Sequence, residues 1–388
     1  MSRTIAAAMI LAVMTTLAPG APLDAETRER GRAVVDRLIG FLTERQAEDG
    51  SWGNTEGRPA LPAITGLVVD GLLMDPRIDA RDPRVRRGID AILEHQNPDG
   101  SIHDGVLPSY NTAICVSALT RAHTGRAADA VRGGVAFLRT VQYHEASTGG
   151  AEAPDFNEPV SRDHPYYGGV GYGRHGRPDL SNLGFFLQAL HDAGVSTQDP
   201  AIERATVFLS RVQMLDETND MAYADASRQG GFIYATVPDL ESVDGRAGQS
   251  QAGSFEEQTP GGGSITRLRA YGSMTYVGFK SLIYADLPPD DPRVVAARRW
   301  IEEHYTLEEN PGMGDQGYYY FVAALGRALG AWGEEEIGGG DWRVDLIDAL
   351  AGLQRDDGSF EVRHERWMES NRELTGAYAL IALQHALR

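Results

Sequence analysis

One short phrase recurs along the chain: a glutamine, three variable residues, then Gly-Ser and a large apolar residue. It occurs at Gln46–Trp52, Gln96–Ile102 and Gln354–Phe360. Each copy closes a run of residues with the apolar spacing of an amphipathic helix. A unit restated this closely indicates an array of similar supersecondary elements, so the fold is expected to be a repeat architecture.

The amphipathic run that precedes the phrase occurs six times. Three of the runs open with an Asp-Pro pair, at Asp82, Asp199 and Asp291, which is typical of an N-cap followed by proline at the first helical position. Where an Asp-Gly pair follows the glutamine, the glycine tolerates positive φ and ends the helix. The runs end at Gln46, Gln96, Gln142, Gln213, Tyr305 and Gln354.

A second, more apolar helix is expected after each of these turns. A helix that is apolar nearly all round is enclosed on both sides, whereas the charged helix before it has one face in water. Six alternations predict an all-α (α/α)6 toroid, with an inner ring of six helices inside an outer ring of six, as a single domain over residues 26–388. The second helices open near Ile64, Asn111, Asn182, Met274, Tyr318 and Leu374.

Two of the units carry insertions, over residues 143–178 and 214–272, and both lie between an outer helix and its inner partner. Connections of one kind share one rim of a toroid, so both long loops should gather around the same mouth. Loops of this length are more often functional than idle. Gly168–Gly173 is expected to be a bent part of this rim rather than a nucleotide motif, since no strand precedes it. Gly261–Gly263 predicts flexibility in the second loop.

Charge and the first residues restrict the partners and the compartment. The formal net charge is −19, which disfavours a nucleic-acid partner. Residues 1–25 hold Arg3, an uncharged apolar stretch and small residues at Ala18–Ala21, and they resemble a secretory signal peptide. The stretch is too short to span a bilayer as a helix. We expect a secreted or periplasmic protein that has no retained transmembrane helix, with contact at a membrane surface left open.

Two residue types with reactive side chains occur once each. Cys115 lies in an apolar helical run and is expected to be a small buried hydrophobe, and as a lone cysteine it can form no internal disulfide. Lys280 lies on an inner helix, where burial without a counter-charge is costly. Lys280 is therefore expected to reach a rim or an acidic partner.

The Gln46–Trp52 phrase resembles the QW motif of squalene and oxidosqualene cyclases. From about residue 27 to residue 388, the chain resembles the prenyltransferase and squalene-oxidase-repeat superfamily of α/α toroids. Gly314–Tyr320 and Arg366–Met368 are similar to phrases of exported bacterial members of that superfamily. The resemblance implies a central cavity lined by the inner helices, and in the catalytic branches that cavity holds an isoprenoid.

The catalytic motifs of those branches are missing from this sequence. No Asp-x-Asp-Asp acid motif occurs, and Asp290–Asp291 is better explained as a helix cap. Asp179-Leu-Ser181 has serine where the zinc-binding prenyltransferases have a cysteine, and no histidine lies between His191 and His304. No cofactor and no metal are therefore expected, and whether the chain is an enzyme is left open.

Residues just before and at the start of the inner helices should face the mouth. The candidates for acid–base chemistry are Asp179, Asp315 and His175, of which the two aspartates have the alternative role of helix caps. At least one ring of Tyr318–Tyr320 should face a cavity or a neighbouring loop, because three consecutive rings cannot share one packed layer. The candidate ligand-binding residues are Tyr110, Asn111, Tyr172, Arg177, Tyr271, Tyr318 and Tyr319.

Three functions remain open from sequence. The first, favoured by the resemblance, is an exported terpene-cyclase-like toroid that binds an isoprenoid or another small apolar ligand. The second is a carbohydrate-active (α/α)6 hydrolase or lyase, which needs two carboxyl groups at a fixed spacing, drawn from Asp179, Asp315 and Glu373. The third is a non-catalytic protein-interaction scaffold. An aromatic and aliphatic lining favours the first, paired carboxylates the second and a filled barrel the third.

Overall fold

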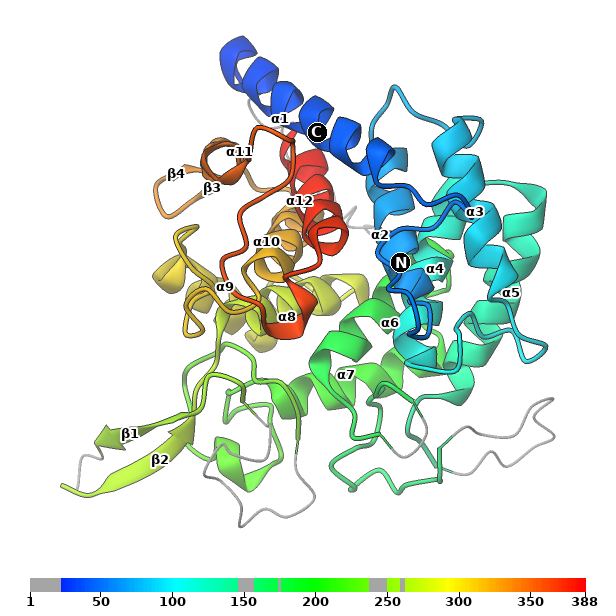
Figure 1. Ribbon diagram of the computed structural model, residues 1–388. Helices are drawn as coiled ribbons and strands as arrows, with labels where there is room; N and C mark the ends of the chain where they lie inside the picture. Colours follow the sequence, from blue (N-terminus) through cyan, green and yellow to red (C-terminus); the bar gives the residue numbers. More distant parts are fainter. Residues whose placement is uncertain (1–21, 146–156, 174–175, 237–249, 259–261) are drawn as a thin grey trace, which may run out of the picture.

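A computed structural model describes residues 22–145, 157–173, 176–236, 250–258 and 262–388. Most of the predicted signal segment, together with His175 and Gly261, lies outside these ranges. The described residues form twelve α-helices, which Figure 1 shows with four short strands. None of the described helices has both the length and the hydropathy needed to cross a bilayer.

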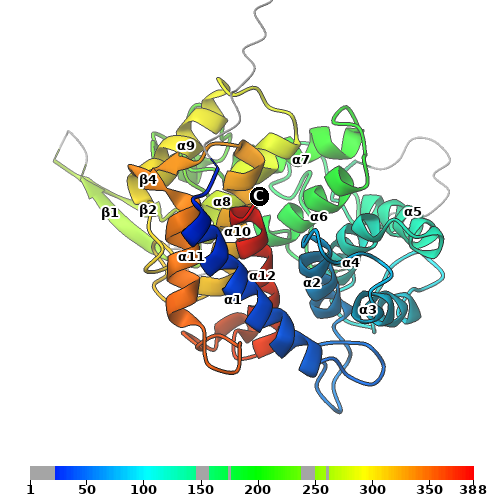
Figure 2. The same cartoon turned by 90° about the horizontal axis from the view of Figure 1, so that it is seen from above.

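Six of the helices form a closed inner ring. Each inner helix packs against the inner helix that follows it in the chain, and α12 packs against α2, which closes the circle (Figures 1 and 2). Most of their residues are buried, as their lack of a polar face predicts. The inner helices are α2 (Pro62–Leu73), α4 (Pro108–Ala122), α6 (Leu180–Asp192), α8 (Gly272–Tyr284), α10 (Tyr318–Trp332) and α12 (Arg372–Ala386).

The other six helices surround this ring, and the predicted (α/α)6 toroid is confirmed. The side chains of Asp82, Asp199 and Asp291 each accept a hydrogen bond from a backbone amide at the start of the helix that follows, as their Asp-Pro pairs predict. The outer helices are α1 (Ala25–Glu44), α3 (Pro83–Glu94), α5 (Gly125–Thr140), α7 (Pro200–Val212), α9 (Pro292–His304) and α11 (Trp342–Leu353).

The repeated glutamine joins neighbouring units. Gln46 Nε2 donates to the carbonyl of Gly50 in its own turn and to that of Arg84 at the start of α3, both at 2.9 Å. Trp52, the last residue of the phrase, is buried and donates from Nε1 to the carbonyl of Leu42 at 2.6 Å. The phrase therefore fixes the end of one outer helix, the turn after it and the start of the next outer helix.

The same arrangement occurs in the two units with insertions, although their sequences hide it. Gln142 Nε2 donates to the carbonyl of Gly168 at 3.0 Å, and Gln213 Nε2 to that of Gly230 at 2.8 Å. Each glutamine also donates at 2.8 Å to a carbonyl at the start of the next outer helix. Both insertions therefore begin inside the repeated phrase, between its glutamine and its glycine.

Gly168 shows why this position requires glycine. Its φ is +81°, and a Cβ would lie 1.9 Å from the carbonyl oxygen of Arg204 on α7. Gly168–Gly173 was expected to be only a bent part of the rim. Gly168 also completes the repeated phrase of the third unit, in which it is the glycine that pairs with Gln142.

The long connection between α7 and α8 contains strands that the sequence did not predict. β1 (Ser254–Gln258) pairs antiparallel with β2 (Ser264–Leu268), and this hairpin projects from the rim in Figure 1. A 3₁₀ turn, η1 (Ala222–Ala224), lies in the same connection, and η2 (Arg366–Met368) precedes α12. The remaining strands, β3 (Glu336–Ile337) and β4 (Gly340–Asp341), lead into α11.

Cys115 lies on α4 and is fully buried with a free thiol, which confirms that it acts as a small hydrophobe. Burial raises the pKa of the Cys115 thiol well above its ordinary value, so the residue is chemically inert at neutral pH.

Candidate functional site

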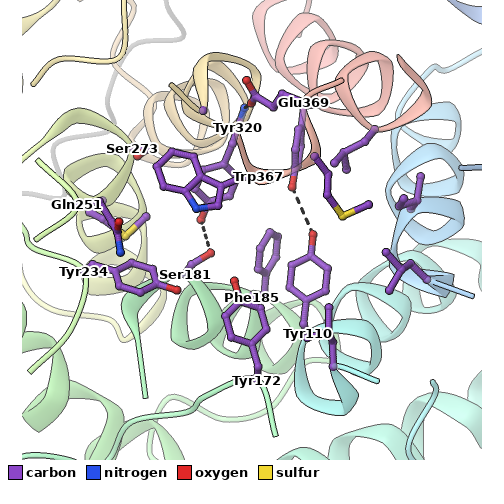
Figure 3. Close-up of a pocket in the computed structure, with 18 of the residues that line it drawn as sticks. Tyr110, Tyr172, Ser181, Phe185, Tyr234, Gln251, Ser273, Tyr320, Trp367 and Glu369 are labelled. Atoms are coloured by element: carbon purple, nitrogen blue, oxygen red, sulfur yellow. Dashed lines mark hydrogen bonds between the residues drawn. The ribbon is translucent and has the colours of Figure 1, made fainter. Parts of the chain in front are cut away.

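A cavity of about 310 Å³ opens at the rim where the outer helices connect to their inner partners. Every inner helix contributes to its wall, either from its first turns or from the residue just before them. The cavity is thus a product of the whole ring. Figure 3 shows most of the residues that line it. The lining residues are Leu61, Ile64, Leu107, Tyr110, Tyr172, Ser181, Phe185, Tyr234, Gln251, Tyr271, Ser273, Met274, Gly317, Tyr320, Trp367, Met368, Glu369, Leu374 and Tyr378.

Aromatic rings form a continuous part of this wall. Phe185 makes an edge contact with Tyr110, with ring centroids 5.3 Å apart, and lies 6.2 Å from Tyr320. Tyr320 contacts Tyr378 at 5.7 Å, and Tyr110 contacts Tyr172 at 6.0 Å. Each of these rings presents apolar surface, and aromatic pairs of this kind hold each other in place.

Several tyrosine hydroxyls of the wall are paired with other wall groups. Ser181 Oγ and Tyr320 OH lie 2.9 Å apart, and Tyr110 OH and Tyr378 OH lie 3.4 Å apart (dashed lines in Figure 3). A hydroxyl that already has a partner is less costly to cover with an apolar ligand. These pairs make the wall more apolar than its tyrosine content alone suggests.

Trp367 and Met368 give the entrance of the cavity an apolar surface. Both side chains are 44% exposed, and both residues have positive φ, 56° and 65°. Two successive non-glycine residues in this region are strained, and such strain is found most often at functional sites. The indole of Trp367 lies against Gly317, where a Cβ would come within 3.0 Å of the ring.

Glu369 is the one carboxyl group among the described residues that line the cavity. Its side chain is 1% exposed, and Oε1 accepts a hydrogen bond from the backbone amide of Tyr320 at 2.9 Å. Oε2 has no hydrogen-bond partner among the described residues. Burial raises the pKa of Glu369 to about 7, against the opposing effect of the amides at the start of α10.

Three of the residues predicted to bind a ligand, Tyr110, Tyr172 and Tyr271, line the cavity. Tyr318 and Tyr319 do not: their hydroxyls donate to the carbonyls of Leu307 and Glu361, at 2.7 and 2.6 Å, and both rings are buried. The third ring of the triplet, Tyr320, is the one that faces the cavity.

Asn111 and Arg177, also predicted to bind a ligand, are not among the described residues that line the cavity. Asn111 is fully buried, accepts a hydrogen bond from the amide of Ala63 at 3.0 Å and donates to the carbonyl of Val106 at 2.9 Å. The guanidinium of Arg177 lies 5.7 Å from the ring centre of Tyr234, which itself lines the cavity.

Asp179 caps α6, the alternative that the sequence offered for it. Its carboxylate accepts from the backbone amide and the side-chain amide of Asn182, at 2.9 and 2.8 Å. Burial raises the pKa of Asp179 to about 6 although these hydrogen bonds favour the charged form. Asp179 is not among the described residues that line the cavity.

Asp315 is exposed and forms an ion pair with Arg363, and His175 lies outside the described residues. Asp315 does not cap α10, because the N-cap residue is Gly317. The carboxylate that accepts a hydrogen bond from the backbone amide of Tyr320, in the first turn of α10, is that of Glu369. The alternative of Asp315 as a helix cap is therefore wrong. Glu373 is bound to Arg45 at 2.6 Å.

Most residues of the wall were not predicted as site residues from the sequence, among them Phe185, Tyr234, Trp367, Glu369 and Tyr378. A local signal existed for two of them. Phe185 follows Ser181, and Tyr378 follows Leu374, by one helical turn, so they share a face with residues at the mouth. For Glu369 no local signal exists, because its partner amide lies 49 residues earlier in the chain.

No group of three or more His, Cys, Asp or Glu side chains suited to a metal ion occurs within the described ranges.

Comparisons with known proteins support the fold class. No family model and no curated protein matches the sequence. Among solved structures, an inactive variant of an α-1,6-mannanase of Salegentibacter with bound α-1,6-mannotriose aligns over 93% of this chain and 100% of its own, with 10% identity and a TM-score of 0.55. A novel α-amylase from Clostridium perfringens aligns over 91% and 97%, with 13% identity and a TM-score of 0.54.

A type II terpene cyclase of Scytonema in complex with merosterolic acid A aligns over 94% of this chain and 99% of its own, with 13% identity, but its TM-score is 0.34. That value is too low to bear on the assignment. The likeness to the mannanase and the amylase shows an α/α toroid, and at these identities it shows the fold alone.

Proposed function

We propose that this protein binds a small apolar ligand of the isoprenoid type in the cavity at the mouth of its toroid. One observation carries the proposal: the cavity wall, which is built from rings and aliphatic side chains of all six inner helices and has Glu369 as its single described carboxyl group. Its volume of about 310 Å³ suits a small ligand, and ligand pockets of this kind are mostly apolar with few polar groups.

A sugar-cleaving activity is less well supported. The mannanase and the amylase that share the fold act on sugars, and such enzymes use two carboxyl groups a few ångströms apart. Here Asp179 is buried as a helix cap, Asp315 and Glu373 are held in ion pairs, and none of the three lines the cavity. A scaffold role is less well supported too, because the centre of the ring is open at the mouth rather than filled.

The proposal is limited to binding and makes no claim of catalysis. It places the protein outside the cytoplasm, on the strength of residues 1–25 alone. Sequencing the N-terminus of the protein purified from its host would test export, and an intact Met1 would contradict it.

Titration with farnesol, a linear isoprenoid alcohol, tests the binding proposal. Trp367 lines the cavity, so farnesol should change the tryptophan emission of the wild type and have little effect on W367F. Leu61→Arg places a charge in the cavity wall and should weaken binding at least about tenfold, since burying an unpaired charge costs more than 1.4 kcal/mol.

Leu73→Arg is the matched control, because it makes the same change at the other end of α2, where the half-buried side chain does not line the cavity. It should leave farnesol affinity unchanged. Saturable binding of α-1,6-mannotriose without any binding of farnesol would overturn the proposal in favour of a sugar ligand.

A further inference from the structure

Lys280 is the single lysine of the chain, among 36 lysine and arginine residues in all. The expectation that it reaches a rim or an acidic partner is wrong. It lies in the middle of α8 with 4% exposure, and its Nζ donates to Gln188 Oε1 at 2.8 Å and lies 3.5 Å from the carbonyl of Gly184. Both acceptors are neutral, and no described carboxylate forms an ion pair with this ammonium group.

The surroundings of Lys280 disfavour its charged form. Burial and the nearby guanidinium of Arg327 lower the pKa of Lys280 to about 7, against the smaller opposing effects of Asp192 and Asp70. Arg327 is itself held by Asp70 at 2.9 Å, which fixes the cation beside the lysine. A lysine that is desolvated and close to another cation is the usual form of an amine nucleophile in proteins.

Lys280 also lies close to the ligand cavity. It lines a small void of about 20 Å³ in the centre of the ring, together with Arg327. Phe185, Tyr320 and Tyr378 line both this void and the mouth cavity. These three rings therefore lie between the cavity and the void. The void has room for about one water molecule, or for a group of the size of a carbonyl.

We propose that Lys280 forms an imine with an apolar ligand that carries an aldehyde at one end. The apolar body occupies the mouth cavity, and the aldehyde passes between Phe185 and Tyr320 into the void. This inference rests on the proposed function and adds the chemical class of the ligand.

The reaction needs no further reagent. The lone pair of the neutral amine adds to the carbonyl carbon and gives a carbinolamine. The carbon–oxygen bond then breaks, the two hydrogens of the amine leave with that oxygen as one molecule of water, and a carbon–nitrogen double bond remains. No oxidation or reduction takes place, and the imine can be hydrolysed by the reverse path.

Reductive trapping tests the inference. The purified full chain would be incubated with farnesal, the aldehyde of farnesol, and sodium cyanoborohydride, and then analysed by intact mass spectrometry and peptide mapping. The expected result is one adduct per chain, located at Lys280. The N-terminal amine is the other amine of the chain, and peptide mapping separates the two. Lys280→Arg keeps a cationic hydrogen-bond donor and should reduce trapping at least tenfold.

Farnesol, which has no carbonyl group, separates this inference from the binding proposal. If farnesol binds the wild type and Lys280→Arg alike while farnesal is trapped only in the wild type, both stand. If farnesol binds but farnesal is trapped nowhere, or only at the N-terminus, the imine inference is overturned and the binding proposal stands. If neither compound binds or reacts, both fail.

Phe185→Ala provides a second measurement, because it removes one of the three rings that line both the cavity and the void. It should speed the trapping of farnesal at Lys280 severalfold. Slower trapping in Phe185→Ala would show that the aldehyde does not reach Lys280 by this route and would overturn the proposed geometry.

Discussion

Gln354 Nε2 donates a hydrogen bond at 2.9 Å to the carbonyl of Val34, which lies 320 residues earlier in the chain. The same nitrogen donates to the carbonyl of Gly358 in its own turn at 3.1 Å. Gln354 therefore joins the last unit to the first in the same way as Gln46 joins the first unit to the second, by a hydrogen bond to a carbonyl of the next outer helix. This contact joins the two ends of the array and helps to close the ring.

Gln354→Ala should reduce the free energy of unfolding by about 1–3 kcal/mol, because it removes three hydrogen bonds. Two are donated by Nε2, whose acceptor carbonyls are left without this donor, and the third is accepted by Oε1 from Arg37 Nε at 2.8 Å. Chemical denaturation would measure the loss. Gln198→Ala, at an exposed position in the loop before α7, is the control and should cost less than about 0.5 kcal/mol. Equal stability of the two variants would show that the glutamine contact does not stabilise the closed ring.

Gly168→Ala should be among the most destabilising substitutions in the chain. The new Cβ would stand 1.9 Å from the carbonyl oxygen of Arg204, and the backbone has a φ of +81°. Gly57→Ala separates these two causes, since Gly57 has a φ of +75° and a Cβ there would have no neighbour within 4 Å. The control should cost about 1–2 kcal/mol and Gly168→Ala at least about 2 kcal/mol more. Similar melting temperatures would contradict the close approach.

Glu369 should make stability fall as the pH rises. Its pKa is about 7 in the folded protein and near the ordinary 4.5 in the unfolded chain. Between these values the folded state keeps a proton that the unfolded state has lost, so stability declines over this window by up to about 3 kcal/mol. Glu369→Gln keeps an oxygen for the amide of Tyr320 and cannot titrate. Its stability relative to wild type should therefore improve from pH 4 to pH 8.

Urea unfolding of both proteins at several pH values would measure this difference. Asp179, with a pKa of about 6, contributes a slope of the same sign, but it does so in both proteins and cancels in the comparison. Parallel stability curves for wild type and Glu369→Gln would show that the Glu369 carboxyl does not carry the raised pKa.

Asp70, near the C-terminal end of α2, should be essential to the stability of the inner ring. This buried carboxylate accepts hydrogen bonds from Arg121 Nε at 2.6 Å and from the guanidinium of Arg327 at 2.9 Å. Asp70→Ala would leave two guanidinium groups side by side without their shared partner and should cost about 3–5 kcal/mol. Asp348→Ala removes an exposed ion pair with Arg30 and should cost less than about 1 kcal/mol. A small effect of Asp70→Ala in thermal unfolding would contradict the structural role of this cluster.

The candidate site was predicted only in part. Tyr110, Tyr172 and Tyr271 line the cavity. Tyr110 and Tyr271 lie at or just before the start of inner helices whose positions the repeat indicates, and Tyr172 lies in the segment that leads into α6. Tyr318 and Tyr320 lie on the same short segment, and only tertiary packing decides which ring points inward. Glu369 and Trp367 come from a loop whose path depends on contacts with α10, and no local pattern specifies those contacts.

The sequence by itself determined the helix pairs, their order and the toroid, because caps, turn glycines and apolar spacing act over a few residues. The tertiary structure decided which glycine completes the phrase of Gln142 and Gln213, since the insertions separate the partners by 26 and 17 residues. It also decided the lining of the cavity and the position of Lys280. Those depend on side chains from six helices that meet only when the ring closes.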